Sequence, residues 1–195
     1  MLPEQFEKQL RFITEIDRMK HILRRTLLVD GSRRENDAEH SWHIAIMAML
    51  LREYADPSVN VDRVVKMCLV HDLIEIYAGD TFAYDAGANA DKLERERASA
   101  DKLFALLPEE QGGELRALWE EFDAEETADA RYAAAMDHLQ PFIHNVMTDG
   151  HTWKEGHVNR EQVYARMAIV KTAVPALWPF VENAVNQGVE AGIIG

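Results

Sequence analysis

The chain has few of the features that mark exported, disulfide-bonded or membrane-spanning proteins. Its 195 residues include a single cysteine, Cys68, so no internal disulfide can form. The longest uncharged apolar runs, residues 44–51 and 172–181, are far shorter than the ~20 residues that cross a bilayer. The first ten residues, MLPEQFEKQL, are charged and contain no apolar signal core. We therefore expect a cytoplasmic protein without a membrane association, in which Cys68 is a buried core residue.

Positive charge is also scarce. The sequence has 21 Lys and Arg residues but 34 Asp and Glu residues, and the resulting net charge of −13 would repel a nucleic-acid polymer. Six of the basic residues nevertheless lie close together in the sequence: Arg18, Lys20, Arg24, Arg25, Arg33 and Arg34. Such a group suits one small phosphorylated ligand, although composition alone favours a solvated helix face followed by a polar loop.

Alternating runs of β-branched residues bounded by turns are missing, whereas apolar residues at three- and four-residue spacing are frequent. This spacing predicts helices over residues 4–24, 37–55, 62–78, 91–107, 115–122, 127–147 and, interrupted by prolines, 159–187. The predicted N-caps are Asp37, Asp62, Thr127 and Asn159. We expect a break at residues 112–113, a loop over 149–157 and a frayed tail after Gln187. The predicted fold class is all-α, a single domain of about six or seven helices.

The helix predicted over residues 62–78 changes character along its length. Val64 and Cys68 mark a stripe that faces the core, and three- and four-residue steps continue it to His71, Asp72 and Glu75 in the segment VHDLIEIYAGD. Buried carboxylates are costly unless they are paired, hydrogen-bonded or bound to a metal. A bound cation would explain all three residues, and a helix that turns these side chains toward solvent is the alternative.

A second helix start carries another histidine. The segment AEHSWH places His40 in the first turn of the helix predicted from residue 37. Imidazole and carboxylate ligands together suit a divalent transition metal such as Mn, Co, Fe, Ni or Zn. His43, one turn further on, could support a metal ligand from behind, but a satisfied surface histidine is the simpler explanation.

A histidine, a His-Asp pair about thirty residues later and a distant aspartate on another helix resemble the HD-domain superfamily of metal-dependent phosphohydrolases. The resemblance implies that His40, His71, Asp72 and Asp137, the last from MDHLQ, bind the metal. It also implies a helical domain with the metal held between helices, often in a homodimer. In this reading residues 1–195 form one HD phosphohydrolase domain, with a core over about 10–145 and C-terminal helices at 159–187 packed on it.

Two longer segments are similar to the bacterial 5′-deoxynucleotidases and related small HD proteins: RTLLVDGSRRENDAEH, residues 25–40, and HDLIEIYAGD, residues 71–80. The resemblance implies that Arg25 orients the substrate phosphate, that Glu75 helps to activate water, and that Asp80 contacts the sugar. We expect the neighbouring Thr81 to assist Asp80. The family has a tryptophan directly after the arginine, where this chain has Thr26, and this departure leaves the preference for ribose or deoxyribose open.

The expected activity is hydrolysis of a phosphomonoester, most simply a nucleoside 5′-monophosphate. Another small phosphate is the alternative: a guanosine polyphosphate, a cyclic nucleotide or a non-nucleotide phosphomonoester. Two non-enzymatic functions are further alternatives: a helical binding module with a structural metal, and a structural protein without a metal. No motif recommends the remaining histidines, His21, His138, His144, His151 and His157, and Trp153 is a weak candidate for covering a substrate.

Overall fold

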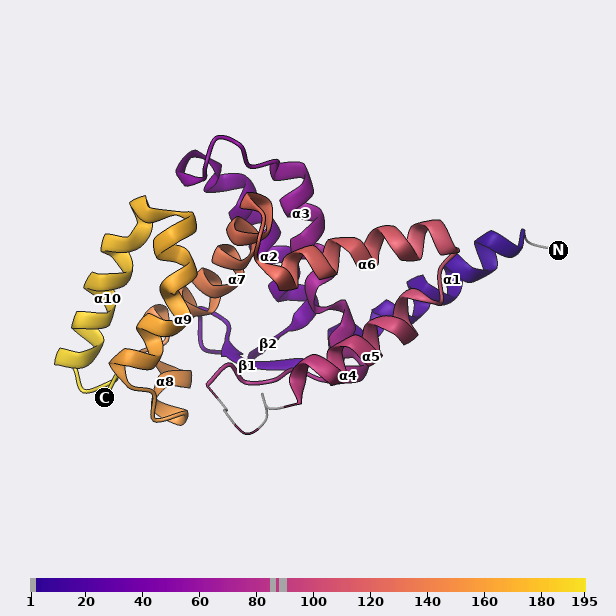
Figure 1. Cartoon of the computed structure of the whole chain (residues 1–195). Helices are drawn as coiled ribbons and strands as arrows, with labels where there is room; N and C mark the ends of the chain where they lie inside the picture. The colour runs from indigo at the N-terminus through magenta and orange to yellow at the C-terminus, as the bar shows by residue number, and fades with distance from the viewer. Residues whose placement is uncertain (1–2, 85–86, 88–90) are drawn as a thin grey trace.

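The computed structural model describes residues 3–84, 87 and 91–195, and helices account for most of them (Figure 1). The elements in chain order are α1 (Glu4–Ile16), η1 (Asp17–His21), β1 (Leu23–Leu27), β2 (Arg34–Asn36), α2 (Asp37–Leu50), η2 (Arg52–Tyr54), α3 (Val61–Val70), η3 (His71–Ile74), α4 (Glu75–Ala78), α5 (Lys92–Phe104), α6 (Glu109–Ala124), α7 (Ala128–Met147), α8 (His151–Glu155), α9 (Arg160–Ala173), η4 (Pro175–Leu177) and α10 (Trp178–Glu190). The predicted all-α class is confirmed. Among the described helices, none combines the length and apolarity needed to cross a membrane.

Two apolar clusters form the interior. The larger one joins α2, α3, α7, α9 and α10 around fully buried residues such as Ile44, Met67 and Leu139. The smaller one joins α1, α5 and α6 to η3 and α4. Cys68 belongs to the larger cluster and Leu73 to the smaller, so η3 lies where the two meet. Packing on both sides fixes this short turn, since each fully buried aliphatic side chain stabilises the fold by about 1.5–3 kcal/mol.

The helix predicted over residues 4–24 is too long. It ends at Ile16, and residues 23–27 and 34–36 form a two-stranded antiparallel hairpin in which Leu23 pairs with Asn36 and Leu27 with Arg34. Gly31 has a φ of +70°, and the Asp30 side chain accepts a hydrogen bond of 2.9 Å from the backbone N–H of Ser32. This turn closes a hairpin too short to produce a sheet-like sequence pattern.

Two predicted N-caps are displaced to asparagines one and two residues earlier in the chain. Asn36 caps α2 in a reciprocal capping box with Glu39, so Asp37 is the first helical residue and is completely buried. Asn60, rather than Asp62, caps α3. Asparagine and aspartate are nearly equivalent caps, so composition could not decide between adjacent candidates. Thr127 and Asn159 cap α7 and α9, which confirms those two predictions.

The glycines at 112–113 lie inside α6 and do not end it. A Cβ atom at Gly112 would stand 2.5 Å from the carbonyl oxygen of Phe104, so this glycine permits the close approach of α6 to the end of α5. The segment predicted as a loop over 149–157 contains the short helix α8.

The tail predicted to fray is packed. The backbone N–H groups of Ile193 and Ile194 both donate to the carbonyl of Gly188, and Ile194 is only 2% exposed. Because Gly188 has no Cβ, the Ile194 side chain can lie against the backbone of α10. The tail therefore belongs to the larger apolar cluster.

Candidate metal centre and substrate pocket

Four side chains from three elements converge on one point. His40 comes from the first turn of α2, His71 and Asp72 from η3, and Asp137 from the middle of α7. His40 Nε2 lies 2.9 Å from Asp137 Oδ1 and 3.8 Å from Asp72 Oδ2. His71 Nε2 lies 3.0 Å from Asp72 Oδ1 and 3.7 Å from Asp137 Oδ1. All four side chains are buried or nearly so, with exposed fractions from 0% to 13%.

The local backbone explains how adjacent residues can both reach this point. The helix predicted over residues 62–78 changes from α to 3₁₀ geometry at His71 and returns to α at Glu75. His71 Nδ1 donates a hydrogen bond of 2.9 Å to the carbonyl of Cys68, which competes with the regular α-helical bonding of that carbonyl. Such 3₁₀ stretches within helices often mark functional positions.

The proton on His71 can be assigned from its surroundings. A backbone carbonyl only accepts hydrogen bonds, so Nδ1 of His71 carries a proton and Nε2 is left to face the carboxylates. That Nε2 is buried and makes no hydrogen bond. Burial alone would lower the pKa of His71, but the carboxylates of Asp72 and Asp137 outweigh it and raise the pKa to about 10. The site thus calls for a positive charge at His71 Nε2, which either a proton or a metal ion can supply.

The spacing of the ligand atoms fits a metal ion. Nitrogen and oxygen ligands about 2.1 Å from one ion, at angles between 90° and 110°, are roughly 3.0–3.4 Å apart. The four imidazole-to-carboxylate separations in this site range from 2.9 to 3.8 Å. Two imidazoles and two carboxylates form a donor set that suits divalent transition metals. The residues present therefore fit a metal ion.

A group of carboxylates continues from this point. Asp37, Asp72 and Glu75 each bring an oxygen within 4.8 Å of the others. Burial, together with the charges of Asp72 and Asp37, raises the pKa of Glu75 well above its ordinary value, and its Oε2 has no hydrogen-bond partner. Burial and the Asp72 charge likewise raise the pKa of Asp37 to about 8. Glu75 is thus a carboxyl group that can hold a proton near neutral pH.

Arg24 provides the positive charge among these carboxylates. Its Nη1 donates a hydrogen bond of 2.9 Å to Asp72 Oδ2 and lies 3.7 Å from Asp37 Oδ1, while its Nε lies 3.5 Å from Glu35 Oε1. Its side chain is only 13% exposed. No motif had distinguished Arg24 from its basic neighbours.

A polar pocket opens beside the metal site. Arg24, Arg25 and Thr26 from β1 line it together with Asp80 and Thr81. The Arg25 guanidinium lies over the ring of Phe82, 4.4 Å from its centroid. Arg95 holds the loop after α4 by donating to the Ala78 carbonyl and to Thr81 Oγ1.

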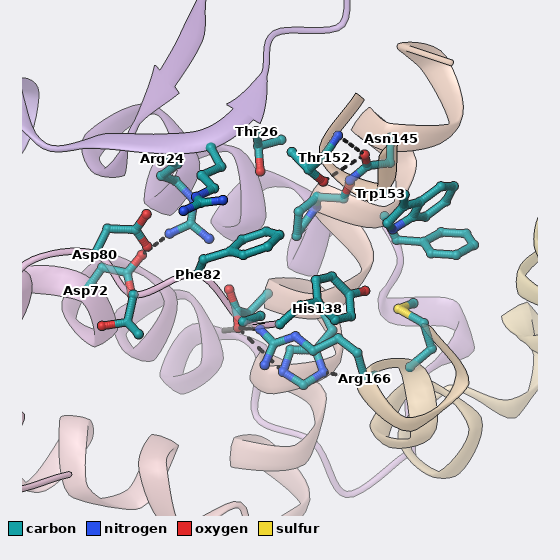
Figure 2. Close-up of a pocket in the computed structure, with 18 of the residues that line it drawn as sticks. Arg24, Thr26, Asp72, Asp80, Phe82, His138, Asn145, Thr152, Trp153 and Arg166 are labelled. Carbon is teal, nitrogen blue, oxygen red and sulfur yellow. Dashed lines mark hydrogen bonds and ion pairs between the residues drawn. The ribbon is translucent and has the colours of Figure 1, made fainter. Parts of the chain in front are cut away.

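The opposite wall comes from α7, α8 and α9 (Figure 2). Asn145 Oδ1 accepts hydrogen bonds from the backbone N–H and the hydroxyl of Thr152. Trp153 lines the pocket but is only 3% exposed and packs against Phe142. Arg166 donates to Asp137 Oδ2 at 3.3 Å, so a residue of the C-terminal region reaches the metal site.

The structure brings all the predicted site residues to one region. The four metal-binding candidates converge, Glu75 lies beside them, and Arg25, Thr26, Asp80 and Thr81 line the adjoining pocket. The basic cluster, in contrast, divides. Arg24 and Arg25 face the pocket, whereas four members form surface ion pairs with nearby acids: Arg18 with Glu15, Lys20 with Asp17, Arg33 with Glu39 and Arg34 with Glu155.

The sequence analysis did not identify two buried polar residues near the site, Glu35 and Gln140, which are 1% and 0% exposed. Helical spacing could have indicated Gln140, because Gln140 and His144 follow Asp137 by three and seven residues and therefore share its face of α7. His144 fulfils the expectation of a satisfied histidine, since its ring is hydrogen-bonded at both nitrogens.

Comparison with known proteins gives consistent matches. The HD domain family matches residues 16–178, a stretch that contains all four metal-binding candidates. The human 5′-deoxynucleotidase HDDC2 is 30% identical over 135 residues, which cover 69% of this chain but slightly less than two thirds, 65%, of that protein. A 5′-deoxynucleotidase of Pasteurella multocida is 30% identical over 107 residues, covering 51% of this chain and 54% of that protein. A crystal structure described as a predicted metal-dependent phosphohydrolase, from Magnetospirillum magnetotacticum, is 49% identical and covers 100% of both chains with a TM-score of 0.94.

Proposed function

The chain belongs to the HD domain family, and on this premise we propose that it is a metal-dependent phosphohydrolase that cleaves the phosphate from nucleoside 5′-monophosphates. One observation carries the proposal. Two imidazoles and two carboxylates converge at the wall of a polar pocket that also presents Arg24 and Arg25. Relatives named 5′-deoxynucleotidase support the nucleotide substrate.

In this proposal His40, His71, Asp72 and Asp137 hold one divalent metal ion, whose identity among Mn, Co, Fe, Ni and Zn is open. The bound metal would polarise the phosphoryl oxygen and lower the pKa of a water molecule. Geometry supports this ligand set, because each histidine Nε2 lies within 3.8 Å of both carboxylates.

The remaining roles fall to the chain's own side chains. Glu75 orients the attacking water and accepts its proton, which suits a buried carboxyl whose pKa is raised. Arg25 binds the substrate phosphate, for which its exposed guanidinium at the pocket edge is available. Asp80 and Thr81 hold the sugar, and Thr26, 7% exposed on the pocket wall, lies beside them with a small side chain.

We also propose a cytoplasmic homodimer that binds neither membranes nor nucleic-acid polymers. Cys68 is a fully buried free thiol, which is compatible with a reducing compartment.

Large apolar side chains remain exposed on α2, among them Trp42 at 61%, Met49 at 57% and Leu50 at 70%, and a second copy would cover them. Light scattering coupled to size exclusion would give the mass in solution, and a monomer at micromolar concentration would contradict the dimer.

The activity is tested on the purified protein with Co²⁺ or Mn²⁺ and a panel of ribo- and deoxyribonucleoside 5′-monophosphates, guanosine polyphosphates, cyclic nucleotides and sugar phosphates. Release of inorganic phosphate is the measured quantity. Asp72→Asn should abolish turnover, whereas Asp62→Asn, an exposed aspartate of α3, is the matched control and should behave as wild type. Cleavage of only a non-nucleotide phosphate would replace the proposed substrate class. Metal binding without any hydrolysis would favour a non-catalytic module.

A further inference from the structure

A chain of buried polar groups lies behind the metal site. His40 Nδ1, on the side of the ring away from Asp137, lies 3.0 Å from Oε1 of Gln140. Gln140 Nε2 in turn lies 2.8 Å from Glu35 Oε2 and 3.1 Å from His144 Nε2. The exposed fractions of these four residues are 2% or less, so water does not compete for the hydrogen bonds.

The surroundings of Gln140 decide which way its amide points. His144 Nδ1 lies 2.8 Å from the carbonyl of Leu27, which can only accept, so His144 carries its proton on Nδ1 and its Nε2 is an acceptor. The carboxylate oxygen of Glu35 is a second acceptor on the same side. Two acceptors at one end of the amide require the NH₂ group there, and the carbonyl oxygen of Gln140 must therefore face His40.

The orientation of Gln140 in turn assigns the proton on His40. Because Gln140 Oε1 can only accept, His40 Nδ1 must donate, and a neutral ring then has its lone pair on Nε2. Nε2 is the atom that faces Asp137 and Asp72. The opposite amide orientation would place a proton on Nε2 and remove His40 as a ligand.

We propose that Gln140, oriented by Glu35 and His144, is a positioning residue that holds His40 in the one tautomer able to bind the metal. This inference rests on the proposed metal site and adds to it residues outside the HD motif. The same row of buried polar groups also contacts a second metal ligand. Glu35 Oε1 lies 3.5 Å from Arg24 Nε, and Arg24 donates a hydrogen bond to Asp72. Two of the four ligands, His40 and Asp72, are thus held through the same buried carboxylate.

Three variants separate this role from simple packing. Gln140→Met keeps the length of the side chain and removes both ends of the amide. Glu35→Gln keeps the shape but lets Gln140 turn over. The double variant Glu35→Gln with Gln140→Glu exchanges the two groups, so that an acceptor again faces His40 Nδ1 and an NH₂ group at position 35 faces the other oxygen at position 140. His144 Nε2, which then faces a carboxylate, takes up a proton to donate to it.

Metal affinity is the first readout, measured by competition between the protein and a chromophoric chelator for Co²⁺. Each single variant should bind Co²⁺ roughly 10- to 100-fold more weakly than wild type, and the double variant should recover most of that loss. Tyr132→Phe is the matched control. Tyr132 lies on the same helix as Gln140 and is 1% exposed. The variant loses the hydrogen bond to the Ala48 carbonyl but leaves Gln140, Glu35 and His144 unchanged, so its Co²⁺ affinity should equal that of wild type.

The second readout needs no metal. In ¹⁵N NMR of the metal-free wild type, the His40 ring should show a protonated Nδ1, because Gln140 Oε1 accepts from it, and in Gln140→Met the proton should instead be on Nε2, which faces Asp137. An unprotonated Nδ1 in the wild type, or equal Co²⁺ affinity in wild type and Gln140→Met, would overturn the positioning role while the metal site itself stands. Failure of the wild type to bind Co²⁺ would instead overturn the proposed function.

Discussion

The two adjacent arginines of β1 should respond very differently to the same substitution. Arg24 lies within 3.7 Å of three buried carboxylates, those of Asp72, Asp37 and Glu35, whereas Arg25 is exposed and lies over the Phe82 ring. Arg24→Met keeps the aliphatic length of the side chain and removes the only charge that these contacts share. Buried carboxylates are then left without compensation, which is among the most destabilising changes a core can suffer.

The magnitude follows from the geometry. A charge pair at 2.9 Å, the separation of Arg24 and Asp72, attracts by about 6 kcal/mol at an effective dielectric constant of ~20. Burial already raises the pKa of Glu35 to about 7 and that of Asp37 to about 8, so both can take up protons at pH 7 and limit the loss. We therefore expect Arg24→Met to lower the free energy of unfolding by about 3–5 kcal/mol, a large part of the ~5–15 kcal/mol typical of a domain.

Urea denaturation of metal-free protein at pH 7 measures this difference. Arg25→Met is the control, and it should change the free energy of unfolding by less than about 1 kcal/mol, since exposed charges contribute little. It should instead raise the KM for the substrate. Equal stabilities of the two variants would refute the assignment of Arg24 as the buried counter-ion, and an unchanged KM in Arg25→Met would remove the phosphate-binding role of Arg25.

Three further outcomes follow from the site and the core. Glu75→Gln should lower kcat by roughly 10²- to 10⁴-fold with the bound metal retained, and comparable kcat at equal metal content would exclude Glu75 as the base. Cys68, whose thiol pKa burial raises, should react with a disulfide reagent at pH 8 only as fast as the protein unfolds, and rapid labelling of the native protein would contradict its burial. Burial lowers the pKa values of His43 and His144 below the ordinary 6.5, so these two histidines bind more protons in the unfolded state as the pH falls, and their contribution to the free energy of unfolding decreases from pH 7 to pH 5.5. Relative to wild type, His43→Gln should therefore gain free energy of unfolding over this range in urea titrations, and the same pH dependence in both proteins would reject the assignment.

The sequence predicted best those helices whose apolar spacing and caps depend only on residues within the same helix. The apolar spacing of α2, α3 and α7 survives in the structure because those helices build the larger core, and the caps at Thr127 and Asn159 depend only on residues three positions away. Elements that depend on distant partners were missed. The hairpin of β1 and β2 has too few residues for a periodic signal. Gly112 lies inside α6 because the end of α5 leaves no room there for a Cβ atom, a contact that the local sequence does not reveal.

The HD motif predicted, through spacing and resemblance, that His40, His71, Asp72 and Asp137 belong together, because a metal needs several ligands and the types of donor are restricted. Only the tertiary structure decided what surrounds them. Arg24 differs from Arg25 in the sequence by one position, yet alternation along β1 sends one into the carboxylates and the other to the pocket edge. The orientation of Gln140 depends on Glu35, 105 residues away, and on the Leu27 carbonyl that fixes the proton of His144, and no local pattern encodes hydrogen bonds between segments that meet only when the chain folds.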